Sequence, residues 1–246
     1  MGGREFAPLM EFVERNSRTV DIFCFQEVFD TEQKSLDDRH GEGICADLFQ
    51  KFSVALPDFE GSFAFFDDNK DRMSLAVFSR RSTVKIKTIE DLVIYKPERP
   101  VEVGKAVLSS RKLQYITFEF NNKEFTVANF HGLWVHAPKT DTPERIAQAE
   151  TIKNFLASRN NPKILCGDFN LLPNTRSLAI MSEGMRELIT EFGITSTRTP
   201  LYRHFHNPDE LNFADYMLVS PDVDMKKFEV LSDVVSDHAP LYLEFS

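Results

Sequence analysis

Cysteine is scarce in this chain and follows no pairing or metal-binding pattern. The 246 residues include only three cysteines, an odd set that cannot pair completely within one chain. No Cys-x-x-Cys pair and no cysteine–histidine spacing typical of zinc sites occurs. Cys24 and Cys166 lie inside apolar runs, where cysteine acts as a small apolar residue in a reducing compartment. The cysteines disfavour a disulfide scaffold and favour a cytoplasmic location.

Long apolar runs and an excess of basic residues are also missing. No stretch reaches the roughly 18 apolar residues that a membrane span needs, and no secretory signal is visible at the start. The formal net charge is −9, which argues against a general electrostatic grip on nucleic acid. The scattered basic residues, among them Lys85, Arg111 and Lys112, are interpreted as solvated surface.

One polar motif directly follows a buried strand. The residues Cys166-Gly167-Asp168-Phe169-Asn170 come after the apolar pair Ile164-Leu165. This order delivers a carboxylate and a carboxamide to the rim of a sheet. The carboxylate can orient or deprotonate a water, and the amide can hold a developing oxyanion. The same residues would also suit an ordinary turn closed by Asx hydrogen bonds.

Three further segments have a comparable construction. The run 21–27 ends in Gln26-Glu27, so a strand that we expect to be buried on both faces carries an acid at its end. In the strand expected over 124–131, period-two spacing places Asn129 and His131 on one face. Near the end of the chain, Ser236-Asp237-His238 precedes a final strand. Each has a simpler interpretation as a capped turn or a satisfied polar pair.

Together these motifs resemble a known family. Gln-Glu, Asn-x-His, Gly-Asp-x-Asn, Asp215-Tyr216 and Ser-Asp-His occur in the order found in the endonuclease/exonuclease/phosphatase superfamily, the DNase I-like metal-dependent phosphoesterases. The resemblance covers residues 1–246 and implies a single domain. It implies an α/β fold, a four-layer α/β/β/α sandwich of two mixed sheets flanked by helices. Periodicity alone indicates only mixed α and β structure.

The resemblance also implies roles for a metal ion and for water. Glu27 would bind a Mg²⁺ or Mn²⁺ cofactor, with Asp237 as a further ligand, either direct or through water. Asp168 would orient or deprotonate the attacking water. Asn170 would hold that water or a phosphate oxygen.

The remaining implied roles concern the phosphate group. His238 would donate to the non-bridging phosphate oxygens, and Asp215 would orient His238 through the other ring nitrogen. His131 would be a second donor on the phosphate side, with Asn129 as its neighbour.

The chain departs from the family at its start. Family members usually open with a strand that ends in a metal-facing Asn, followed shortly by Gly. This sequence begins Met1-Gly2-Gly3-Arg4 and continues directly into a helical pattern. We therefore expect that the usual first strand is missing upstream of Met1, or that another residue fills the role of its Asn.

Helices are expected over 5–16, 44–52 and 143–158, with short ones near 175–182 and 185–190. Strands are expected over 21–27, 62–66, 73–79, 84–95, 106–120, 124–131, 163–168, 214–219, 226–232 and 240–245. Thr142-Pro143 is a typical helix start, because Thr caps the first turn and Pro fits its first position.

The leading functional hypothesis is a hydrolase of phosphodiesters or phosphomonoesters that uses an activated water. Its substrate would be a nucleic acid, a nucleotide, a phosphoinositide or a phospholipid head group, and the acidic balance favours a compact phosphorylated molecule over long duplex DNA. One alternative is a catalytically impaired binding scaffold of the same fold. Another is a zinc hydrolase built on His204 and His206, although these residues flank a turn and lack a suitably spaced third ligand. The sequence leaves the oligomeric state open.

Overall fold

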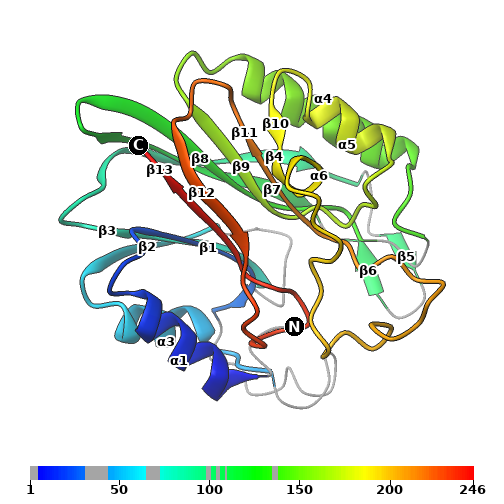
Figure 1. Ribbon diagram of the computed structural model, residues 1–246, viewed down its shortest axis with the longest axis horizontal. Coiled ribbons are helices and arrows are strands. Elements are labelled where there is room, and N and C mark those ends of the chain that lie inside the picture. Colours follow the sequence, from blue (N-terminus) through cyan, green and yellow to red (C-terminus); the bar gives the residue numbers. More distant parts are fainter. Residues whose placement is uncertain are drawn as a thin grey trace.

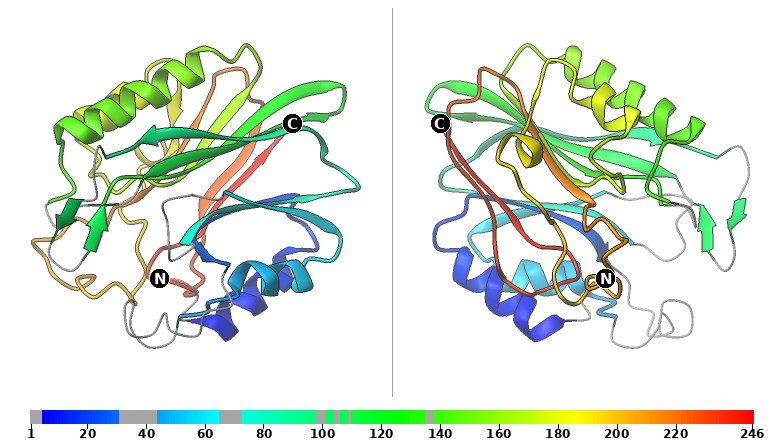
Figure 2. Two further views of the ribbon diagram at one scale, coloured as in Figure 1. Left: turned by 180° about the vertical axis from the view of Figure 1, so that it is seen from behind. Right: turned by 45° about the vertical axis from the view of Figure 1, so that its right-hand side comes forward.

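Two facing sheets with helices on their outer sides form the molecule (Figure 1). The computed structural model describes residues 5–30, 44–64, 73–97, 101–103, 106–108, 110–134 and 138–246. Both views of Figure 2 show the same order of layers, helix, sheet, sheet and helix. The predicted α/β sandwich is therefore confirmed.

The larger sheet has six strands in the order β10-β11-β9-β8-β7-β4. Its strands β8 and β9 are parallel, and its other neighbouring pairs are antiparallel, so this sheet is mixed as expected. The strand bounds are β4 Lys85–Tyr95, β7 Arg111–Phe120, β8 Lys123–His131, β9 Lys163–Asp168, β10 Arg186–Glu187 and β11 Asp215–Val219.

The smaller sheet has the order β1-β3-β2, and its described strand pairs are antiparallel. Its strands are β1 Ile22–Phe29, β2 Phe59–Phe63 and β3 Met73–Arg80. Two further strand pairs belong to neither of these sheets. One is formed by β5 Val101–Val103 and β6 Ala106–Leu108, and the other by β12 Met225–Val230 and β13 Leu241–Phe245.

The helices bury one face each against these sheets. Helices α4 Pro143–Ala157 and α5 Arg176–Met181 cover the larger sheet, while α1 Phe6–Asn16 and α3 Leu48–Ala55 cover the smaller one (Figure 1). The apolar face of α4, with Ala149 and Ile152, joins the core of the larger sheet. Phe12 and Phe52 join a second core under the smaller sheet. No helix among the described residues combines the length and the apolar character needed to cross a membrane.

Two expected helices differ from the structure. The helix expected over 44–52 begins only at Leu48 and continues to Ala55. The helix expected over 185–190 is the two-residue strand β10 followed by the short helix α6 Leu188–Glu191. The physical reason is that Arg186 and Glu187 pair with β11, while the Glu187 carboxylate accepts from the N–H groups of Ile189 and Thr190 and thereby starts α6.

Candidate active site

The Gly-Asp-x-Asn motif lies where β9 ends, between two strands that bring other polar residues beside it. In the sheet register, Asp168 lies opposite His131 of β8 on one side and Asp215 of β11 on the other. Gly167 is required at this point: a Cβ there would lie 2.0 Å from the Phe130 carbonyl oxygen, and its φ is +137°. The sheet thus brings together three of the residues that the sequence predicted for the site.

Asp168 is held on both of its oxygens. Its Oδ1 accepts a 2.8 Å hydrogen bond from the Asn170 N–H, the Asx turn that the simpler interpretation of this motif anticipated. Its Oδ2 lies 3.8 Å from His131 Nε2 and 3.7 Å from His238 Nε2. Burial raises the pKa of Asp168, but the nearby His238, His131 and Arg198 outweigh it and lower that pKa below its ordinary value. The turn and the site role therefore coexist in one carboxylate.

Asn170 is buried in a conformation that few side chains adopt. Its φ is 53°, in the left-handed region that Asn tolerates better than most residues. Its side-chain Nδ2 donates to the Gly132 carbonyl oxygen over 3.3 Å, which ties the end of β9 to the end of β8. The amide is thereby held beside the Asp168 carboxylate.

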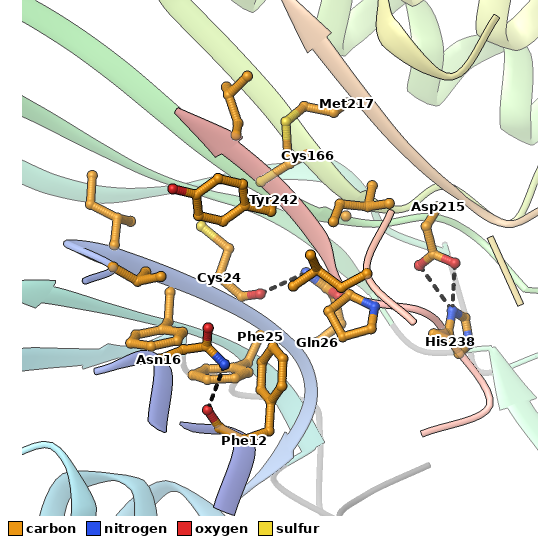
Figure 3. Close-up of a pocket in the computed structure, with 18 of the residues that line it drawn as sticks. Phe12, Asn16, Cys24, Phe25, Gln26, Cys166, Asp215, Met217, His238 and Tyr242 are labelled. Atoms are coloured by element: carbon orange, nitrogen blue, oxygen red, sulfur yellow. Dashed lines mark hydrogen bonds and ion pairs between the residues drawn. The ribbon is translucent and has the colours of Figure 1, made fainter. Parts of the chain in front are cut away.

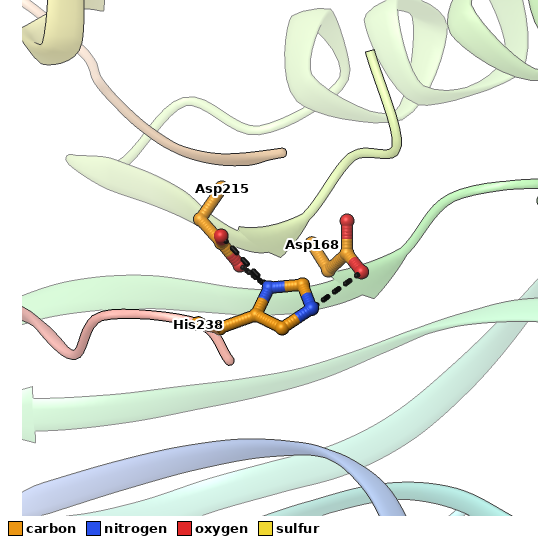
Figure 4. Close-up of side chains that lie close together, drawn as sticks. All are labelled: Asp168, Asp215 and His238. Atoms are coloured by element: carbon orange, nitrogen blue, oxygen red, sulfur yellow. Dashed lines mark hydrogen bonds and ion pairs between the residues drawn. The ribbon is translucent and has the colours of Figure 1, made fainter. Parts of the chain in front are cut away.

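His238 approaches Asp168 from the loop before β13, with Asp215 behind it (Figure 4). Its Nδ1 donates to the Asp215 carboxylate, at 2.9 and 2.8 Å from the two oxygens, and its Nε2 faces Asp168. Burial lowers the pKa of His238, but the carboxylates of Asp215 and Asp168 outweigh that effect and raise it. A carboxylate that holds the far nitrogen of an imidazole fixes its tautomer and orientation.

Glu27 lies at an irregular point of β1. The pairing of β1 with β3 shifts between Phe25 and Val28, and Glu27 there has a φ of 54°. Burial raises the pKa of Glu27. Positive groups, among them His131 and His238, outweigh this effect, so the pKa of Glu27 lies below its ordinary value. Glu27 and Asp168 line the same pocket, part of which Figure 3 shows.

Asp237 and Asn129 have partners of their own. Asp237 Oδ2 accepts a 3.0 Å ion-paired hydrogen bond from Arg198, and its assignment as a metal ligand stays a prediction. Asn129 is fully buried and spans the two sheets: its Nδ2 donates to the carbonyl oxygens of Phe25 and Ala76, and its Oδ1 accepts from Gln26. Asn129 therefore supports the strand that carries Glu27.

Three basic residues near the centre were not predicted as site residues. Arg111 was interpreted as solvated surface, which was wrong, because it is half-buried and interacts electrostatically with Glu27 and Asp168. Burial, reinforced by Arg198, lowers the pKa of Lys139 to about 8, against the opposing influence of Asp168. Arg198 is buried, and its Nε is a donor with no hydrogen-bond partner among the described residues. No local pattern around these residues distinguishes them from surface charges.

The donor set suits a hard divalent cation. Ligand atoms of Asp168, Asp215 and His238 all lie within 4.8 Å of one another, and Glu27 is not a member of this group. Carboxylate oxygens are the ligands that Mg²⁺ and Mn²⁺ prefer. Within the described parts of the chain this is the one such group, and His204 and His206 do not belong to it.

The chain belongs to the Endonuclease/Exonuclease/phosphatase family, whose model matches residues 2–238. The resemblance predicted from the ordered motifs is thereby confirmed. A search of curated proteins gave no match.

Solved structures of this family share the fold. A mannosyl-6-phosphatase of Bacteroides thetaiotaomicron is 20% identical, with a TM-score of 0.71 over 98% of this chain and 91% of that one. The catalytic domain of human Nocturnin, with a bound sulfate anion, is 17% identical, with a TM-score of 0.65 over 98% of this chain and 86% of that one. TDP2 of D. rerio, complexed with a single-strand DNA product, is 14% identical, with a TM-score of 0.69 over 100% and 92% of the two chains. The fold is therefore DNase I-like, and family membership supports a hydrolase of the phosphoesterase type.

Proposed function

We propose that this protein is a divalent-metal-dependent phosphoesterase that hydrolyses a phosphodiester or phosphomonoester with an activated water. The observation that carries the proposal is the convergence of Asp168, Asp215 and His238 at one edge of the larger sheet. Glu27 is the residue that would hold Mg²⁺ or Mn²⁺, with Asp237, whose Oδ1 lies 3.9 Å from His238 Nε2, as a further ligand. A bound cation would polarise the phosphoryl oxygen and stabilise the leaving oxygen.

The chain's own residues supply the proton and the charge complementarity. Asp168, whose pKa is lowered, is anionic at neutral pH and orients or deprotonates the attacking water. His238 in its charged form donates from Nε2 to a phosphate oxygen, while Asp215 holds its Nδ1. His131 and the Asn170 amide provide further donors on the same side. Arg198, buried and paired with Asp237, adds positive charge near the same centre.

For the substrate, we propose a chemical class rather than a single molecule. The net charge of −9 favours a compact phosphorylated molecule, such as a sugar phosphate, a nucleotide or a lipid head group, over long duplex DNA. The three cysteines are free thiols, which supports a reducing, cytoplasmic setting.

The test is hydrolysis of bis-p-nitrophenyl phosphate and of p-nitrophenyl phosphate, each with Mg²⁺, with Mn²⁺ and with excess EDTA. We expect metal-dependent release of p-nitrophenol from at least one of the two, which also separates diesterase from monoesterase. Hydrolysis that EDTA does not reduce would contradict metal dependence. Binding of phosphate esters without turnover, across a screen that includes nucleotides, phosphoinositides and sugar phosphates, would favour the impaired scaffold instead.

A further inference from the structure

Lys139 is a cation beside the active site that has no anionic partner among the described residues. Its ammonium interacts electrostatically with Asp168, Asp215 and Asp237 but forms no ion pair with any of them. Its one hydrogen-bond partner in the described parts of the chain is the carbonyl oxygen of Phe213, a neutral acceptor 2.9 Å away. An ammonium has three donors, so two of them are left for a ligand. Lys139 is only half-buried and can therefore be reached from solvent.

The neighbouring cation, Arg198, is not available in the same way. Its guanidinium lies 3.0 Å from the Asp237 carboxylate, and its side chain is only 5% exposed. Both cations lie against one aromatic ring, with Arg198 Cζ 4.6 Å and Lys139 Nζ 5.7 Å from the centroid of the Tyr202 ring. An aromatic face attracts a cation but carries no net charge. Tyr202 therefore supports the position of Lys139 without neutralising it.

The backbone at Lys139 is held on both sides. Its carbonyl oxygen accepts a 2.9 Å hydrogen bond from the N–H of Leu172, which follows the Gly-Asp-x-Asn motif. The buried Arg145 of α4 donates to the carbonyl oxygens of Pro138 and Thr140, the residues before and after Lys139. A cation on a fixed backbone loses less entropy on binding an anion than a mobile surface lysine does. The positive charge is thus preorganised beside the active site.

This arrangement is costly without a ligand. Burial lowers the pKa of Lys139, so its surroundings disfavour the charged form despite the nearby acids. An anionic oxygen within hydrogen-bonding distance would compensate the charge, because buried charges in proteins are stable when they are paired.

The number of oxygens on the phosphate group indicates which ester supplies that anion. The proposed function assigns one phosphate oxygen to His238 and one to the divalent cation. A phosphodiester has two non-bridging oxygens and one negative charge, so these two contacts already use both oxygens. A phosphomonoester has three such oxygens and a charge close to −2 at neutral pH. Lys139 supplies a further donor together with a matching positive charge.

We propose that Lys139 binds the third terminal oxygen of a phosphomonoester, so that this protein acts on compact phosphomonoesters in preference to phosphodiesters. The inference rests on the proposed function and deepens it by naming the ester class. Lys139 is then a specificity-determining residue, since it contacts an oxygen that only one of the two ester classes has.

The test compares kcat/KM for p-nitrophenyl phosphate and for bis-p-nitrophenyl phosphate, with Mg²⁺, in the unmodified protein and two variants. The variants are Lys139→Met and the control Lys85→Met, whose lysine side chain on β4 is 78% exposed. We expect the unmodified protein to prefer the monoester. Lys139→Met should lower kcat/KM for the monoester by about 10- to 100-fold, the usual contribution of a hydrogen bond to a charged group, and the diester value much less. Lys85→Met should alter neither.

Two non-hydrolysable ligands give a measurement that does not depend on turnover. Phenylphosphonate and its monomethyl ester differ by one charged oxygen, and calorimetry with Mg²⁺ at neutral pH gives the Kd of each. Lys139→Met should weaken binding of phenylphosphonate by about 10- to 100-fold and binding of the ester much less. If the unmodified protein hydrolyses neither p-nitrophenyl ester, the proposed function fails, and this comparison still decides whether Lys139 binds the third oxygen.

Three results would overturn the proposal. The first is a preference of the unmodified protein for the diester, or equal losses for both esters in Lys139→Met, which would leave Lys139 only a general attraction for anions. The second is no binding of phenylphosphonate by the unmodified protein at millimolar concentration. The third concerns a nucleoside that carries a p-nitrophenyl phosphodiester and, on its other hydroxyl, a separate phosphate. If Lys139→Met impairs its hydrolysis more than that of p-nitrophenyl phosphate, Lys139 binds the separate phosphate instead.

Discussion

Strand β9 carries an acid at its end and β1 carries one near its end, but the two acids lie in different settings. β9 lies inside the six-stranded sheet with β8 and β11 on its two sides, whereas β1 pairs with β3 alone among the described strands. Asp168 is buried, and its Oδ1 accepts from the Asn170 N–H. Glu27 lies at a bulge with a φ of 54°, a conformation that costs about 1–3 kcal/mol in a residue other than glycine. The same sequence construction therefore gives one acid on a strand between two neighbours and one at a bulge of a strand with a single described neighbour.

Replacement of the well-held acid should have the largest effect. Asp168→Asn preserves shape and removes the base, so we expect kcat on the best substrate to fall by at least about 100-fold while KM changes little. The matched control is Asp224→Asn, an exposed acid in the turn before β12, which should leave kcat unchanged. Near-normal turnover in Asp168→Asn would mean that this residue serves only the turn.

The support of the strand that carries Glu27 can be removed separately. Asn129→Ala leaves the carbonyl oxygens of Phe25 and Ala76 without the amide that donates to them. We expect urea denaturation to show a loss of about 2–4 kcal/mol in the free energy of unfolding, since each unpaired buried acceptor costs about 1–3 kcal/mol. Amide exchange should accelerate in β1 more than in β9. Exposed Asn154 on α4 is the control, and equal acceleration in both strands would contradict a specific support of β1.

Glu27→Gln tests whether the acid on β1 binds the metal. We expect Mn²⁺ affinity to fall by at least about tenfold. Loss of a residue that only hydrogen-bonds a metal ligand already lowers the affinity by about that factor. Glu60→Gln provides the control, because Glu60 is an exposed acid on β2 in the same sheet. An anomalous signal from bound Mn²⁺ should lie about 2.0–2.6 Å from a Glu27 oxygen. Unchanged affinity, or a signal between His204 and His206, would contradict the assignment.

The sequence was sufficient for those parts of the fold and site that local patterns encode. Apolar runs followed by acids singled out Glu27 and Asp168, and the order of five motifs along the chain led to the family. The same patterns predicted helix α4, where Thr142 accepts from the Arg145 N–H as a cap and Pro143 is the first helical residue.

Long-range packing could not be predicted in this way. Arg111 and Arg198 resemble surface charges in sequence, and only the assembled sheets bury them beside Asp168 and Asp237. Asn129 gave no indication that its amide would span two sheets, because its partners Phe25 and Ala76 lie far from it along the chain.

Lys139 extends the comparison to a half-buried cation. It donates to the Phe213 carbonyl oxygen, and burial lowers its pKa to about 8 from the ordinary 10.5. Below pH 8 both the folded and the unfolded chain bind the proton, so the folded state carries the full cost of the buried charge. Between pH 8 and 10.5 the unfolded chain binds more protons than the folded one, so stability rises with pH across this window.

Lys139→Met removes that cost. We expect the free energy of unfolding at pH 7 to rise by about 1–2 kcal/mol, less than the full shift implies because the side chain is partly exposed. The gain should shrink toward zero near pH 10, and exposed Lys85→Met should show no such dependence on pH. A gain that is equal at pH 7 and pH 10 would indicate better packing rather than loss of charge.

Hydrolysis by Lys139→Met should nevertheless be slower, because a cation beside Asp168 and Asp215 lowers the repulsion that an incoming phosphate meets. A charge that weakens the fold and strengthens the reaction is expected at a site selected for chemistry rather than for stability.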